Sequence, residues 1–146
     1  MAFAEESWVL VGEVTGGVWL GRLIGHRTGE TASVDVAWRA TLRREERYGD
    51  VVGFLHTHPP KPVSAGPPAP SARDVRTMAA WCSCFGKPLL CAIAAGEALA
   101  GFVFAGGHGG YVRADRIVRL GRQSRPAIVA VHDVDALTDQ EVTDAG

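Results

Sequence analysis

The sequence predicts a single domain of the α/β class, and three observations favour this fold class. The chain has 146 residues, a length that suits one domain with one proper hydrophobic core. Hydrophobic residues make up 47% of the chain and charged residues 21%, the ordinary balance of a globular protein. Apolar, strand-like segments are separated by stretches of helical or charged character. Residues 1–126 are expected to form this domain, and residues 127–146 a C-terminal tail that is acidic at its end and frays.

Seven segments have the apolar content or the alternation of β-strands. They are residues 8–14, 17–25, 31–38, 51–57, 88–95, 98–105 and 111–120. Thr15-Gly16-Gly17 and Gly96-Glu97 are expected to be the tight turns of two hairpins. The charged stretch 39–50 is expected to be a solvated helix or loop.

A second helix is predicted to begin after Ser71. Ser71 suits the N-cap position because its hydroxyl can accept the amide hydrogen of Asp74, whose carboxylate can reach back in a variant of the capping box. Gly86 is the expected end of the helix. The apolar positions between them fall at helical spacing: Val75, Met78, Ala79, Cys82 and Phe85.

Composition and charge give no sign of several classes of partner and suggest a location for the protein. The formal net charge of −1 gives no global reason to expect nucleic acid or an anionic membrane as a partner. The first residues, MAFAEESWVLVGE, carry acids where a signal peptide would carry basic residues, and no apolar run is long enough for a membrane span. Three cysteines within ten residues, together with thirteen arginines against two lysines, suggest a bacterial protein of the reducing cytoplasm.

Two histidines stand at the end of the apolar strand 51–57. Residues two apart in a strand point to the same face, so His56 and His58 would present their imidazoles side by side. This spacing can supply two ligands to one metal, and a catalytic zinc typically has three protein ligands and an open fourth position. Asp74 is the candidate third ligand. The alternatives are two polar residues where a strand reaches solvent and a carboxylate that only caps a helix.

The pattern His56-Thr57-His58-Pro59, followed by Pro70-Ser71-Ala72-Arg73-Asp74, resembles the motif of the JAMM (JAB/MPN+) zinc metalloproteases, His-x-His and then Ser-x-x-Asp. The resemblance covers roughly residues 8–105 and implies a mixed β-sheet with flanking helices, the JAB/MPN or cytidine-deaminase-like fold. It also implies that His56, His58 and Asp74 hold Zn²⁺. The spacer 59–70, with six of the eight prolines, is longer than the family commonly has, and extra loop residues cost little in closure entropy.

The resemblance further implies a glutamate upstream that acts as a general base. Glu13 in Glu13-Val14-Thr15-Gly16-Gly17 is the expected base, with Glu6 and Glu30 in reserve. In the implied mechanism, zinc activates a water molecule, and Glu13 accepts its proton and returns it to the leaving amine. The Ser71 hydroxyl is expected to stabilise the oxyanion.

The expected function is therefore that of a zinc-dependent, deubiquitinase-like isopeptidase or peptidase. Relatives cleave after the C-terminal glycine of a ubiquitin-like protein, in a conjugate or a precursor, and ubiquitin-like activating and conjugating enzymes are expected partners. A non-catalytic scaffold of the same fold and a cell-wall or sulfur-carrier peptidase of the same superfamily remain alternatives. Unrelated hydrolases fit less well: Pro60 stands where metallo-β-lactamase-like enzymes need an acid, and an amidohydrolase barrel needs about 250 residues.

The remaining cysteines, histidines and arginines are expected to be structural or solvated. Cys82 and Cys84 would point about 200° apart on a helix, which argues against a second metal site. Cys91 is expected in the core. The histidines without ligand-like neighbours are His26, His108 and His132. The arginines between 113 and 125 are expected to follow a solvated strand edge and loop.

Overall fold

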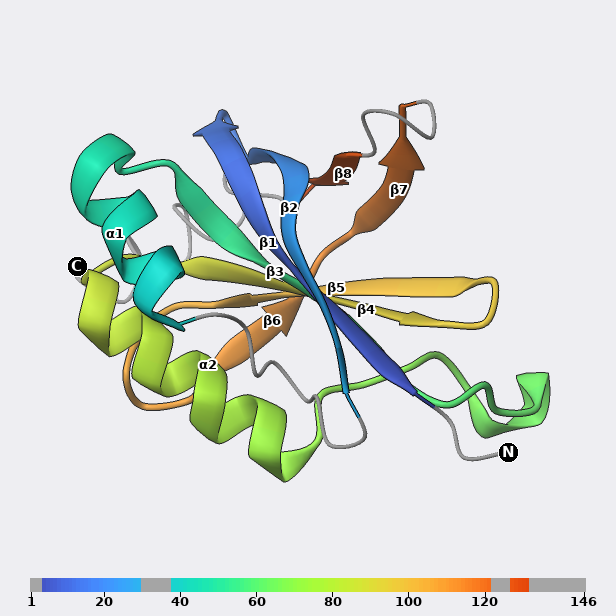
Figure 1. Ribbon diagram of the computed structural model, residues 1–146. Coiled ribbons are helices and arrows are strands. Elements are labelled where there is room, and N and C mark those ends of the chain that lie inside the picture. Colours follow the sequence, from blue (N-terminus) through green and yellow to red (C-terminus); the bar gives the residue numbers. More distant parts are fainter. Residues whose placement is uncertain (1–3, 30–37, 122–126, 132–146) are drawn as a thin grey trace, which may run out of the picture.

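The computed structural model describes residues 4–29, 38–121 and 127–131 (Figure 1). In chain order its elements are β1 (Glu5–Thr15), β2 (Val18–Gly29), α1 (Trp38–Tyr48), β3 (Val51–Thr57), the short 3-10 turn η1 (Val63–Ala65), α2 (Ala72–Phe85), β4 (Leu89–Ala95), β5 (Ala98–Phe104), β6 (Tyr111–Arg113), β7 (Arg116–Leu120) and β8 (Ala127–Val131). This is one domain with a mixed sheet and two α-helices, which confirms the broad α/β class.

The described strands form one sheet in the order β6-β5-β4-β3-β1-β2-β8-β7. Only β3 and β4 are parallel, and α2 makes the crossover between them; the other neighbouring pairs are antiparallel. The antiparallel pairing of β1 with β3 places the start of β1 beside the end of β3. In Figure 1, α1 and α2 lie next to each other against the sheet.

The sheet separates two hydrophobic cores. The first lies between the sheet and α2, where Met78 and Cys82 pack against Phe54 and its neighbours on the strands. The second lies on the opposite face and includes Ala114 and Ile117, from the connection between β6 and β7 and from β7 itself. Because β6 and β7 stand at opposite ends of the strand order, this connection curls the sheet around the second core. The backbone amide of Ala114 donates to the carbonyl of Gly101, 2.8 Å away.

Most of the expected elements are confirmed, and two expectations are wrong. Residues 111–120 form two strands, β6 and β7, because the chain turns at Ala114 and Asp115 and crosses from one edge of the sheet to the other. The tail expected from residue 127 does not begin there, since residues 127–131 form β8 between β2 and β7. Of the strand expected at 31–38, residues 31–37 lie outside the described residues, and Trp38 begins α1.

Local sequence explains the ends of the elements that matter for the site. The hairpin of β1 and β2 turns at Gly16 and Gly17, both of which have positive φ angles, 57° and 78°. The capping box at Ser71 and Asp74 is formed as predicted, and α2 ends at Gly86 in the left-handed conformation. Among the helices within the described ranges, none has the length and apolar character to cross a membrane.

Candidate metal centre

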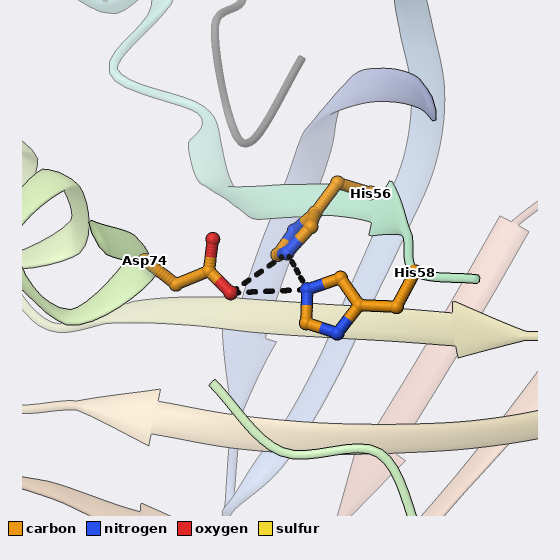
Figure 2. A group of neighbouring side chains, drawn as sticks. All are labelled: His56, His58 and Asp74. Carbon is orange, nitrogen blue, oxygen red and sulfur yellow. Dashed lines mark hydrogen bonds and ion pairs between the residues drawn. The ribbon is translucent and has the colours of Figure 1, made fainter. Parts of the chain in front are cut away.

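Three side chains converge at the end of β3 and the first turn of α2 (Figure 2). The Nε2 atoms of His56 and His58 are 3.0 Å apart, and each lies 3.1 Å from Oδ2 of Asp74. The side chains of His56 and Asp74 are 0% exposed, whereas that of His58 is 18% exposed. The structure thus brings together all three residues that the sequence predicts as metal ligands.

The two histidines reach this point through the pairing of β3 with β4. His56 lies on the α2 face of the sheet, two residues after Phe54, which packs in the first core. Beyond the end of β3, the amide of His58 donates to the carbonyl of Ala94 at 2.8 Å. This bond keeps the chain extended past the last strand residue, and His58 therefore stays on the same face as His56.

The helix cap fixes the carboxylate of Asp74. The amide of Asp74 donates to Oγ of Ser71 at 3.1 Å, and the amide of Ser71 donates to Oδ2 of Asp74 at 2.9 Å. Burial would raise the pKa of Asp74, but the hydrogen bonds from His56 and His58, with the amide of Ser71, outweigh it and hold this pKa well below its ordinary value. Capping and metal binding are thus compatible roles for one carboxylate.

The arrangement fits a cation better than it fits hydrogen bonding alone. Neutral imidazole has one N–H, and two Nε2 atoms that face each other and a shared carboxylate oxygen cannot all be satisfied by protons. Ligands about 2.05 Å from a tetrahedral zinc would be about 3.3 Å apart, close to the separations here. Three buried polar atoms in or next to the trio also lack hydrogen-bond partners within the described structure. They are Nδ1 of His56, Oδ1 of Asp74 and Oγ of Ser7, which stands opposite His56 in the sheet.

Glu13, the expected base, is not brought to this group. It pairs with Leu20 near the far end of β1 and is exposed. The pairing of β1 with β3 runs from Ser7 opposite His56 to Val11 opposite Val51, so Glu13 lies beyond the start of β3. Six residues separate it from Ser7, which corresponds to about 20 Å along an extended strand.

Glu5 is a further candidate for a general base, and the sequence analysis did not single it out. Glu5, Ser7 and Val9 alternate along β1 on the face that carries the trio, and Glu5 lies two residues before Ser7, which stands opposite His56 near the end of β3. The side chain is partly buried, and its Oε2 is buried without a hydrogen-bond partner among the described residues. A buried carboxylate oxygen without a partner is costly in a purely structural role.

Of the two reserve glutamates, only Glu6 lies within the described residues, and its side chain does not face the trio. The amide of Glu6 donates to Oγ1 of Thr57 at 2.8 Å, but its side chain belongs to the opposite face. There Oε1 of Glu6 lies 3.1 Å from Nε2 of His26, whose ring stacks on Trp8. Glu30 lies outside the described residues.

A pocket of about 400 Å³ opens beside the trio. Its walls come from the proline-rich spacer and from the ends of β4 and β5, and both His58 and Ser71 line it. Ser71 therefore stands where its hydroxyl could meet a substrate that approaches the trio.

The cysteines and His108 are not part of the trio. Cys82 and Cys91 are buried, Cys84 is exposed, and Nδ1 of His108 accepts the amide hydrogen of Gly110.

Comparison with protein-family models finds no match to this chain, and comparison with curated proteins finds no similar sequence.

Proposed function

We propose that the chain is a JAMM-type zinc metallopeptidase with a JAB/MPN fold. The observation that supports this most directly is the convergence of two imidazole nitrogens and one carboxylate oxygen on one point, 3.0 to 3.1 Å from one another. Two histidines and one carboxylate are a typical ligand set of catalytic zinc, which leaves a fourth position open. The motif that carries the family resemblance supplies these same three residues.

The residues around the trio suit hydrolysis of an amide bond. When bound, zinc supplies a Lewis acid that polarises a carbonyl and makes water acidic enough to be a nucleophile near neutral pH. Glu5, in place of Glu13, accepts the proton at its buried Oε2 and returns it to the leaving amine. The Ser71 hydroxyl donates to the oxyanion from the N-cap of α2. His58 is the only partly exposed ligand, so the substrate approaches from the pocket beside it.

The proposed substrate is a ubiquitin-like protein, cleaved after its C-terminal glycine. Ubiquitin-like activating and conjugating enzymes are proposed partners, and a bacterial cytoplasm is the proposed location. A cell-wall or sulfur-carrier peptidase would use the same site and differ only in substrate. A non-catalytic scaffold has no need of converging ligand atoms or of a buried carboxylate beside them.

A cleavage assay tests this proposal. The purified protein is loaded with zinc and incubated with a reporter protein fused after the terminal glycine of a ubiquitin-like protein. We expect release of the reporter, its abolition by a chelator and its recovery on addition of zinc. Zinc-loaded protein that leaves both this fusion and an isopeptide-linked conjugate intact would contradict the proposal.

Two substitutions of Ser71 separate capping from catalysis. Ser71→Ala removes the hydroxyl that accepts the Asp74 amide hydrogen, and we expect the free energy of unfolding to fall by about 1 kcal/mol. We expect kcat to fall about 100-fold, because an oxyanion donor is lost. Ser71→Asp keeps a good cap and should restore stability but not kcat, as measured by denaturant unfolding and initial rates. Full activity of Ser71→Ala would remove Ser71 from the reaction.

The spacer is expected to affect substrate choice and not metal binding. The ligands are held by the pairing of β3 with β4 and by the cap of α2, so deletion of residues 64–68 should leave zinc content unchanged. The same deletion removes part of the pocket wall and should change relative kcat/KM among substrates. Pro67→Ala/Pro68→Ala, which keeps the length, is the control for loop stiffness. Loss of zinc on deletion would show that the loop sets the ligand geometry.

A further inference from the structure

The pocket beside the trio has features that bear on the substrate of the proposed peptidase. One wall is the spacer, including Gly66 and several proline residues, and the other is formed by Ala95 and Ala98 at the hairpin of β4 and β5. Proline rings restrict the backbone, so this wall is largely preformed. A volume of about 400 Å³ is within the range of small-molecule sites and admits a short segment of chain.

The pocket is also the route to the trio. His56 and Asp74 are fully buried, and His58 is the one ligand with exposed surface. His58 and Ser71 both line the pocket. A substrate whose scissile carbonyl meets a metal held by the trio would therefore place its neighbouring atoms in this pocket.

Lys61 gives the pocket lining a permanent positive charge. Of the described residues that line the pocket, only His58 and Lys61 are ionisable, and none is acidic. The other lysine of the chain, Lys87, lies 2.7 Å from Oε2 of Glu45 and donates to the carbonyl of Gly49. No hydrogen bond or ion pair links Lys61 to another of the described residues. Among the described residues its ammonium group thus has no partner, and most of the other residues that line this small site are prolines, alanines and a glycine.

We propose that Lys61 binds a free carboxylate of the substrate, the C-terminal α-carboxylate of the portion that is released. This inference rests on the proposed function and narrows its substrate class. The released portion would be one or a few C-terminal residues of a precursor, and not a folded protein linked through a lysine side chain. The reaction is the same hydrolysis: the amide C–N bond breaks, the hydroxyl of water joins the carbonyl carbon, and a proton goes to the released amine.

Binding of two small probes tests the proposal separately from catalysis. N-acetyl-Gly-Gly-Ala with a free carboxylate and the same peptide with a C-terminal amide are titrated by calorimetry into zinc-loaded Glu5→Gln protein. We expect the free acid to bind about tenfold more tightly, because a hydrogen bond to a charged group is gained. In Lys61→Met the two probes should bind equally, with unchanged zinc content, while Lys61→Arg should keep most of the preference. If Glu5→Gln still turns the probes over, the same ratio is read from kcat/KM.

Three results would overturn the inference. They are equal binding of the two probes to protein that has Lys61, no binding of either probe, and a preference for the free acid that survives in Lys61→Met. The last result would place the carboxylate on the ion itself. Failure of the proposed function would look different, because wild-type protein would then leave all peptide and fusion substrates intact whichever probe it binds.

Discussion

Replacement of Glu5 by glutamine is expected to abolish hydrolysis and leave zinc content unchanged. Glutamine has nearly the same shape but cannot accept the proton, and loss of a general base typically lowers kcat by about 10²- to 10⁴-fold. Glu5 is not among the three converging ligands, so the trio should still bind its ion. The measurement is kcat with the fusion substrate, alongside metal content by mass spectrometry.

Glu13→Gln is the matched control. It makes the same chemical change on the same strand, but at an exposed position near the other end of β1. We expect its kcat and zinc content to equal those of the wild type. Loss of activity in Glu13→Gln with full activity in Glu5→Gln would contradict the pairing of β1 with β3 on which the assignment of Glu5 rests.

Replacement of His58 by alanine is expected to remove both zinc and activity, and to remove the stabilisation that zinc provides. Any ligand that binds only the folded state stabilises it, by about 4 kcal/mol when its concentration is 1,000 times its Kd. A chelator should therefore lower the Tm of the wild type clearly and that of His58→Ala hardly at all. Thermal unfolding with and without chelator, together with metal analysis, measures both effects.

His26→Ala is the control for this experiment. His26 lies on the other face of the sheet, where it stacks on Trp8 and contacts Glu6. Its removal should leave zinc content and the chelator effect as in the wild type. A His58→Ala variant that keeps one zinc per chain and the full effect of the chelator would place the metal elsewhere.

The three candidate metal ligands could be predicted because the placement of each depends on local sequence. Residues two apart in a strand point to one face, so His56 and His58 lie side by side. A capping box holds Asp74 in the first turn of α2. Sequence spacing alone does not predict that the two histidines and Asp74 lie close together. The crossover from β3 through α2 to β4 brings them together, and only the family resemblance predicted this.

The structure does not bring Glu13 to the trio, because which residues of β1 lie beside the trio depends on strand pairing between distant residues. Glu13 precedes a glycine-rich turn and is conspicuous in sequence, whereas Glu5 is one of two adjacent glutamates at a strand start. Only the antiparallel register of Ser7 with His56 brings the beginning of β1 to the site. Residues 111–120 were predicted as one strand for the same reason, since strand pairing cannot be derived from local sequence. They form two strands at the two ends of the strand order, and Ala114 between them packs in the second core.

Zinc-edge X-ray absorption on the purified protein, with zinc counted per chain, tests directly whether His56, His58 and Asp74 bind zinc. We expect one zinc per chain, bound by two imidazole nitrogens and carboxylate or water oxygen at about 2.0 to 2.2 Å, and we expect this signal to be lost in Asp74→Ala. Absence of zinc from protein purified without chelators and then offered the metal would contradict this expectation. So would a shell of sulfur ligands at about 2.3 Å, which would assign the metal to the cysteines.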